Sequence, residues 1–78
     1  MKKSECEALI NSKTHLIGTT VEIVRGRKIK KKVKGTLIKV YCECFSEIVE
    51  VNNKENCKAI GLIDQGGELI KISADELP

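Results

Sequence analysis

The stretch from Thr20 to Tyr41, which reads TVEIVRGRKIKKKVKGTLIKVY, decides the fold. β-Branched residues dominate both of its ends, 20–24 and 33–41, and their alternation places apolar side chains on one face of an extended chain. Between the two ends lies a basic segment, residues 25–34, in which Gly26 breaks the alternation. The stretch therefore predicts two strands that are joined by a long basic connection.

The basic connection concentrates the positive charge of the chain. Seven of the ten residues from Arg25 to Lys34 are basic, and no acidic residue occurs between Glu22 and Glu43. Residues 23–42 carry eight positive charges, so in a chain of net charge +3 the remainder carries −5. A positive segment on a small folded domain is an electrostatic site for a polyanion. We predict that nucleic acid or an acidic partner binds Arg25, Arg27, Lys28, Lys30, Lys31, Lys32, Lys34 and Lys39.

Contact with phosphates is the chemistry that this segment suits, since Lys supplies a point charge and Arg a bidentate fork. Such contacts release counterions and carry no base information, so binding should be sensitive to salt and largely independent of sequence. Tyr41 and Phe45 are the only large aromatic residues, and we expect both to pack in the core. Double-stranded or structured RNA needs less base stacking than a single strand does, so RNA is the favoured partner.

Two alternatives to nucleic-acid binding stay open. The basic segment can be a solvated loop whose charge only aids solubility. The chain can also be a protein-interaction module, for example a viral or mobile-element inhibitor or regulator that docks on an acidic surface of a larger protein. Small size, an added helix and the mixed charge of the chain support that alternative, because complementary patches steer protein association.

Outside this stretch, the sequence predicts a short N-terminal helix and three further strands. Ser4 and Glu7 form a potential capping box for a helix over residues 4–13. We predict the further strands at 43–51, 57–63 and 68–73, tight connections at 42–44, 52–56 and 64–67, and a last helical turn at 74–77. Five strands in series predict a mostly β fold, a small antiparallel barrel over residues 17–78 that follows a helical extension over residues 1–16.

Two parts of the sequence resemble a known family. Residues 17–28 and 33–40 resemble the KOW-type segment of Src-homology-3-like barrels, in which a strand, a glycine, a basic loop, a second glycine and another strand follow one another. Residues 60–72, with Leu77, look like the closing hairpin and final turn of the same barrel. The chain departs from the pattern in its longer gap between the glycines and in its extra helix. The resemblance implies a five-stranded barrel of a kind that serves in RNA-binding ribosomal and transcription factors and equally in protein-interaction modules.

Four cysteines bear on the compartment and on metal binding: Cys6, Cys42, Cys44 and Cys57. Neither a membrane-spanning apolar run nor a signal-peptide pattern occurs, so we expect a cytoplasmic protein whose cysteines are reduced. One Cys-x-Cys pair and two single cysteines lack the paired Cys-x-x-Cys spacing of structural zinc sites. We therefore expect buried free thiols that pack as small hydrophobic groups, with no metal and no cofactor. Zinc bound by all four thiolates is the alternative.

Catalysis has little support in this sequence. His15 is the sole histidine, and neither a nucleophile motif nor a phosphate-binding glycine loop accompanies it. We therefore expect a binding module without catalytic residues. The sequence leaves the oligomeric state open, because an exposed strand edge permits a homodimer but no residue requires one.

Overall fold

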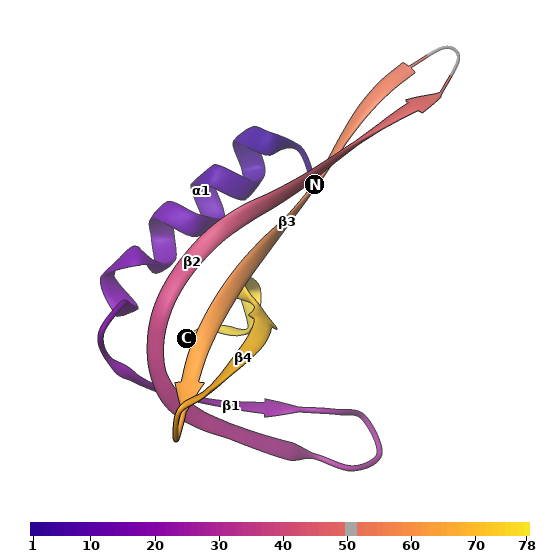
Figure 1. The fold of residues 1–78 in the computed structure, drawn as a ribbon. Coiled ribbons are helices and arrows are strands. Elements are labelled where there is room, and N and C mark those ends of the chain that lie inside the picture. The colour runs from indigo at the N-terminus through magenta and orange to yellow at the C-terminus, as the bar shows by residue number, and fades with distance from the viewer. Residues whose placement is uncertain (50–51) are drawn as a thin grey trace.

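The computed structural model describes the backbone of residues 1–49 and 52–78 and the side chains of residues 1–45 and 56–78. In order along the chain, the elements are α1 (Lys3–Lys13), the 3-10 turn η1 (Thr14–Leu16), β1 (Thr20–Arg25), β2 (Lys31–Val49), β3 (Asn52–Gln65), β4 (Glu68–Ser73) and the 3-10 turn η2 (Ala74–Glu76). The four strands form one antiparallel sheet in the order β1-β2-β3-β4. Figure 1 shows the sheet curled into a half-barrel, with α1 running along β2. The prediction of a mostly β antiparallel fold with one N-terminal helix is confirmed.

The predicted division into five strands is wrong in the middle of the chain. The structure has one strand, β2, where the sequence predicted two strands around a connection at 42–44. The predicted turn at 52–56 belongs to β3, while residues 50 and 51, predicted to end a strand, lie outside the described residues. The pairing of β2 with β3 shifts register between Leu37 and Lys39. Because a β-bulge bends a strand without ending it, one long strand follows the curl of the sheet.

The basic connection is shorter than predicted. β1 ends at Arg25 and β2 begins at Lys31, so residues 26–30 form the connection and the later lysines belong to the sheet. Gly26 has a φ of +103°, and a Cβ at this position would collide with the carbonyl group of Ile29. The reversal of the chain therefore depends on glycine. Lys32 stands opposite Val24, and Lys34 opposite Glu22.

The two ends of the chain follow the sequence prediction more closely. The predicted helix at 4–13 is α1, although Lys2 occupies its N-cap in place of Ser4. Gly66 and Gly67 both have positive φ between β3 and β4, as the predicted Gly-Gly hairpin requires. The N–H group of Gly67 donates a hydrogen bond of 2.9 Å to Oδ1 of Asp64. The predicted final turn is η2.

The hydrophobic core lies between α1 and one face of the sheet, which we call the helix-side face. Side chains alternate between the faces of a strand, and all the buried apolar residues of the sheet except Ile60 share this face. They are Val21, Ile23, Val33, Leu37, Val40, Cys57, Ala59, Ile63 and Ile72. Leu9 and Ile10 of α1 pack against them, and Ala74 and Leu77 at the C-terminus complete the cluster. No helix in the described part of the chain is long and apolar enough to cross a membrane.

The prediction of free thiols is wrong. Cys6 of α1 is bonded to Cys42 of β2, and Cys44 of β2 is bonded to Cys57 of β3. The burial that we expected of cysteine is confirmed for Cys6 and Cys57, which are 0% and 2% exposed. The first disulfide ties the only α-helix of the described residues to the sheet, and the second links two neighbouring strands.

Candidate nucleic-acid interface

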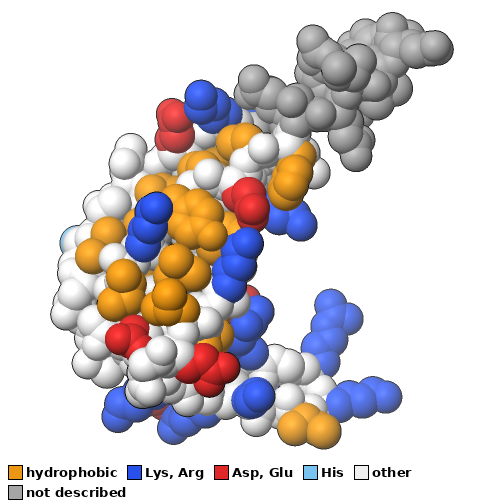
Figure 2. All heavy atoms as spheres, viewed as in Figure 1, with side chains coloured by type: hydrophobic (Ala, Val, Ile, Leu, Met, Phe, Trp, Pro, Cys, Tyr) orange, Lys and Arg blue, Asp and Glu red, His pale blue; other side chains and the backbone are white. Residues whose placement is uncertain are grey.

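The predicted binding segment forms the end of the β1–β2 hairpin, and we call residues 25–34 the arm. Figure 1 shows this hairpin extending sideways from the base of the curled sheet. Figure 2 shows Lys and Arg side chains standing out around its end, with hydrophobic atoms among them. Ile29 in the connection is 85% exposed. The arm therefore presents its charges on the ends of two paired strands and on the connection 26–30 that joins them.

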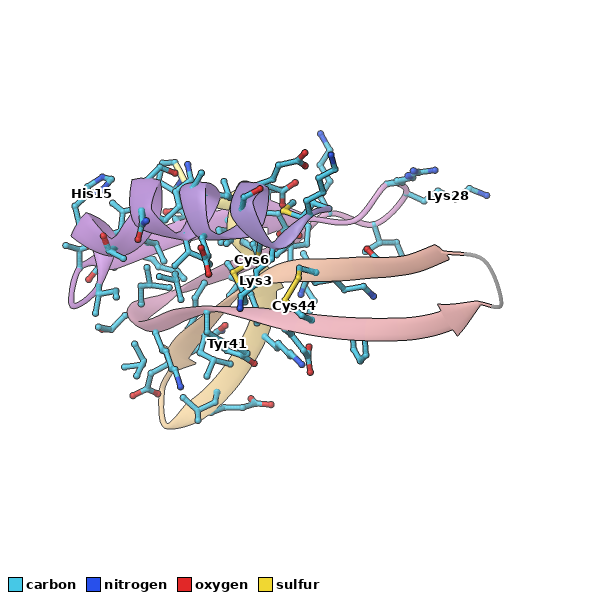
Figure 3. All side chains as sticks on the ribbon, turned by 90° about the horizontal axis from the view of Figure 1, so that it is seen from above. Lys3, Cys6, His15, Lys28, Tyr41 and Cys44 are labelled. Carbon is cyan, nitrogen blue, oxygen red and sulfur yellow. A yellow bond between two sulfur atoms is a disulfide. The ribbon has the colours of Figure 1, made fainter. Side chains whose placement is uncertain are left out.

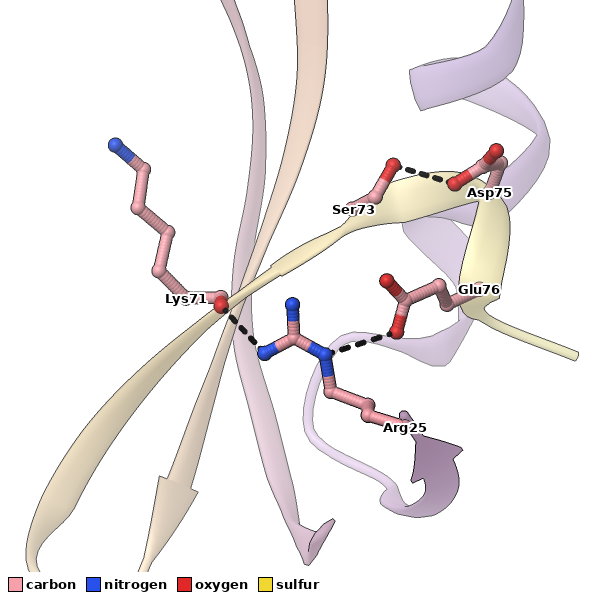
Figure 4. A network of polar contacts seen from close by, with 5 residues as sticks. All are labelled: Arg25, Lys71, Ser73, Asp75 and Glu76. Carbon is pink, nitrogen blue, oxygen red and sulfur yellow. Dashed lines mark hydrogen bonds and ion pairs between the residues drawn. The ribbon is translucent and has the colours of Figure 1, made fainter. Parts of the chain in front are cut away.

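Arg25, at the base of the arm, is engaged with the C-terminal part of the chain. Its Nη1 donates a hydrogen bond of 3.3 Å to the carbonyl oxygen of Lys71, and its Nε lies 3.3 Å from Oε2 of Glu76 (Figure 4). β1 and β4 are the two edges of the sheet. The guanidinium of Arg25 thus links one edge of the half-barrel to the other, which gives this predicted binding residue a structural role.

Lys32 also forms an ion pair, in this case with a residue of β1. Its Nζ lies 2.7 Å from Oε1 of Glu22. The hydrogen bond and the positive charge of Lys32 lower the pKa of Glu22, and the carboxylate in turn raises the pKa of Lys32. Both groups are solvent-exposed, so the pair is of a kind that stabilises a protein little. The pair nevertheless compensates one charge of the arm.

Five cations of the arm make no ion pair with any side chain that the structure describes: Arg27, Lys28, Lys30, Lys31 and Lys34. The first three belong to the connection, and the other two belong to β2. Lys31 shares the face of Val33, whereas Lys34 points to the opposite face. Positive charge therefore surrounds the end of the ribbon, and it is these five residues that remain available for a polyanion.

A groove opens between the arm and the closing β3–β4 hairpin, with a cavity volume of about 440 Å³. The arm contributes Arg25, Gly26, Ile29, Lys31, Lys32 and Val33, and the closing hairpin contributes Gln65, Glu68 and Ile70. The sequence prediction missed this groove because its two walls are separated by some thirty residues of chain. One wall carries cations and the other carries Glu68, and Ile29, Val33 and Ile70 add apolar groups to the lining.

Lys39, the last predicted binding residue, lies beyond the bulge on the sheet face opposite α1, which we call the outer face. Its Nζ is 5.2 Å from the ring centroid of Tyr41, within the range of a cation–π contact. Figure 3 shows Tyr41 on the side of the sheet away from α1. Lys39 is therefore separate from the arm and belongs to a second surface.

The outer face carries exposed apolar groups that the sequence prediction placed elsewhere. Phe45 is 50% exposed, so our expectation that it packs in the core is wrong. Ile38 and Leu69 are also exposed, and Lys71 pairs with Glu43 at 3.2 Å on the same face. Figure 2 shows hydrophobic side chains gathered on one face of the molecule among basic and acidic side chains. The alternation around Cys42 and Cys44 contained the signal, because residues 41, 43 and 45 must point away from the cysteines.

Comparison with known proteins adds no relative: no protein family, curated protein or solved structure matches this chain. The resemblance to KOW-type barrels therefore stays a prediction.

In the described part of the chain, no group of three or more His, Cys, Asp or Glu side chains is arranged to hold a metal ion while the cysteines are paired as disulfides.

Proposed function

We propose that this chain is a small non-enzymatic module that binds nucleic acid, with RNA favoured, through the arm. One observation carries the proposal: five cations without a described ion partner surround the end of a projecting two-stranded ribbon. Held close together, these cations repel one another, and a polyanion relieves that repulsion. A paired ribbon also loses less conformational entropy on binding than a free loop does.

The charge of the arm sets the expected salt dependence. If the five cations each replace a counterion on the phosphate backbone, log affinity falls with log salt at a slope of about −4.5 for a duplex and about −3.5 for a single strand. A-form RNA is recognised mainly through shape, phosphates and 2′-hydroxyls. These contacts suit an arm whose described side chains are cationic or aliphatic, and they support RNA as the partner.

The test is fluorescence anisotropy with labelled RNA and DNA duplexes and single strands at low and moderate salt. The variant Arg27→Gln/Lys28→Gln/Lys30→Gln removes three charges from the connection, where no described ion pair is lost. We expect its duplex slope to fall to about −1.8, since two cations remain. The matched control Lys2→Gln/Lys3→Gln/Lys58→Gln removes three exposed charges outside the arm. Equal losses in both variants, or only millimolar affinity of the parent protein at low salt, would count against the proposal.

A protein-interaction module is the second candidate, and the outer face favours it. Exposed Phe45, Ile38 and Leu69 lie on a face that also carries Lys39 and Lys71. Aromatic groups are enriched at the centres of protein interfaces, and the lysines suit an acidic partner surface. A nuclease-treated pull-down separates the candidates. A partner that survives nuclease and is lost with Phe45→Ser, but not with the triple arm variant, supports this second function.

We further propose that the curled sheet is an open form of the five-stranded Src-homology-3-like barrel. The Gly66–Gly67 hairpin, the 3-10 turn η2 and the contact of Arg25 with β4 support this relationship. An experimental structure tests it: β1 and β4 should face each other across a narrow gap, and a flat sheet with widely separated edges would contradict the proposal.

A further inference from the structure

The four cysteines come from three elements and meet at one place. Cys42 and Cys44 are two residues apart on β2, so their side chains share the helix-side face. Cys57 stands opposite Cys44 on β3, and Cys6 reaches Cys42 from α1. Figure 3 shows Cys6 and Cys44 close together beneath the N-terminal part of α1. Positions that are far apart in the sequence therefore form one sulfur cluster.

The backbone distances of this cluster suit a tetrahedral metal site. The Cα atoms are 6.1 Å apart for Cys6 and Cys42 and 3.9 Å apart for Cys44 and Cys57. Residues i and i+2 of a strand, such as Cys42 and Cys44, are about 6.6 Å apart. Four thiolates at about 2.3 Å from a zinc ion are roughly 3.8 Å from one another. Two sulfurs released from a disulfide need to separate by only about 2 Å, and rotation of the side chains provides that.

We propose that in the reduced protein Cys6, Cys42, Cys44 and Cys57 bind one zinc ion as four thiolates. A thiol reductant R′SH cleaves each disulfide, so that RS–SR and two R′SH give two RSH and R′S–SR′. Four protein thiols then release four protons to the solvent as Zn²⁺ binds, which leaves a Zn(SR)₄ centre of charge −2. The zinc replaces the two disulfides as the link between α1, β2 and β3.

The surroundings of the cluster fit such a centre. Cys6 and Cys57 are almost fully buried, which keeps water from their sulfurs, while Cys44 is exposed and leaves a path for the ion to enter. The N-terminal ammonium group donates to the carbonyl oxygen of Cys57 at 3.2 Å and to Oδ1 of Asn56 at 3.1 Å. The N–H group of Cys57 donates to the carbonyl oxygen of Met1 at 2.8 Å. These contacts hold Met1 beside the backbone of Cys57.

A four-thiolate zinc site is compatible with the predicted cytoplasmic location, where thiols are kept reduced. A chain of this size buries a small core, and metal binding then contributes directly to its folding. Zinc would supply in a reducing compartment the same links that the disulfides supply under oxidising conditions.

Metal analysis of protein expressed in a reducing cytoplasm, and purified with a phosphine reductant, tests the proposal. We expect about one zinc per chain and four thiols that react with a thiol reagent only after a chelator is added. Replacement by Co²⁺ should give the thiolate-to-cobalt charge-transfer bands and the intense visible bands of a tetrahedral sulfur site. Folded, reduced wild-type protein with four reactive thiols and less than about 0.1 equivalent of zinc would overturn the proposal.

Two double variants distinguish a shared site from two separate links. Cys6→Ser/Cys42→Ser and Cys44→Ser/Cys57→Ser should each lose nearly all of the zinc, because either pair supplies half of the ligands. The control His15→Ala should keep it, since His15 is a surface residue of η1. Retention of a full equivalent of zinc by either double variant contradicts a four-thiolate site. If neither variant folds, the cobalt spectrum of the wild-type protein still decides the question.

Discussion

β2 carries two regions of opposite character. At its start, the arm presents lysines to the solvent and is joined to the rest of the molecule by hydrogen bonds, ion pairs and the packing of Val33 in the core. Further along, Cys42 and Cys44 tie the same strand covalently to α1 and to β3. The arm owes its shape to a local turn and a neighbouring strand, whereas the cysteine cluster depends on residues far apart in the chain. The difference separates the part of the molecule that we propose binds a polyanion from the part that holds the fold together.

Removal of one disulfide from the oxidised protein should have the largest effect on stability. Cys6→Ser/Cys42→Ser removes a disulfide that spans 36 residues of sequence. Because the unfolded chain then gains conformational entropy, the free energy of unfolding should fall by about 4 kcal/mol. Cys44→Ser/Cys57→Ser opens a link of 13 residues and should cost about 3 kcal/mol. Urea unfolding without reductant measures both. A smaller loss for the longer link would show that α1 docks on the sheet without the help of Cys6.

Gly26→Ala should distort the arm and leave the cysteine end intact. The positive φ of Gly26 and the collision of a Cβ with the carbonyl of Ile29 predict a loss of about 2–3 kcal/mol, unless the arm rearranges. Gly66→Ala is the matched control, because Gly66 also has a positive φ but a Cβ there would meet open space. This substitution should lower the free energy of unfolding by about 1 kcal/mol. Thermal melting and RNA anisotropy are the measurements. If the two variants behave alike, the reversal at Gly26 does not depend on the close approach of Ile29.

Arg25 should act on stability and little on binding. Its contact with Glu76 is partly exposed, so Arg25→Gln should cost at most about 1 kcal/mol. Glu76→Gln removes the same ion pair from the other side and should produce a similar loss, although it leaves the charge of the arm unchanged. Urea unfolding compares the two variants, and anisotropy compares their RNA affinity. A large loss of affinity in Arg25→Gln with no loss of stability would instead return Arg25 to the binding surface.

The smallest expected effect concerns the ion pair of Glu22 with Lys32 and appears as a pH dependence. The hydrogen bond and the positive charge of Lys32 lower the pKa of Glu22 below the ordinary value of a glutamate. The pair therefore contributes fully above the unfolded pKa of Glu22 and is lost as the pH falls through the lower folded pKa. Unfolding titrations between pH 6 and the acid range, compared with Glu22→Gln, measure this contribution. A variant whose stability profile matches the parent at every pH shows that the pair contributes nothing.

Local signals explain which parts of the fold could be predicted. The β-branched run that became β1, the Gly-Gly hairpin and the final turn each depend on neighbours within a few residues. The predicted turns at 42–44 and 52–56 failed for the opposite reason. Both stretches contain residues with a low preference for strands, yet each is paired with the neighbouring strand: residues 42–44 of β2 stand opposite residues 57–59 of β3, and residues 52–56 of β3 stand opposite residues 45–49 of β2. Pairing between distant segments outweighs local preference.

The candidate interface divides in the same way. The sequence identified all the cations, because charge is a property of each residue, but it could not separate Arg25 and Lys32 from the five that lack described ion partners. That distinction depends on Glu76 of η2 and Glu22 of β1, which both lie outside the arm. The outer face was missed because the bulge and the uninterrupted β2 decide which side chains point away from α1.

By itself, the sequence determined a small, mostly β chain with a helix at its start, a glycine-dependent reversal at Gly26 and a cluster of positive charge after it. These depend on backbone preference and on charge, which act over a few residues. Only the tertiary structure decided that the sheet curls as four strands in the described residues, that Arg25 joins its two edges, and that four scattered cysteines meet beside α1. Those outcomes depend on contacts between distant residues, which form only when the curl of β2 and the packing of α1 bring them together.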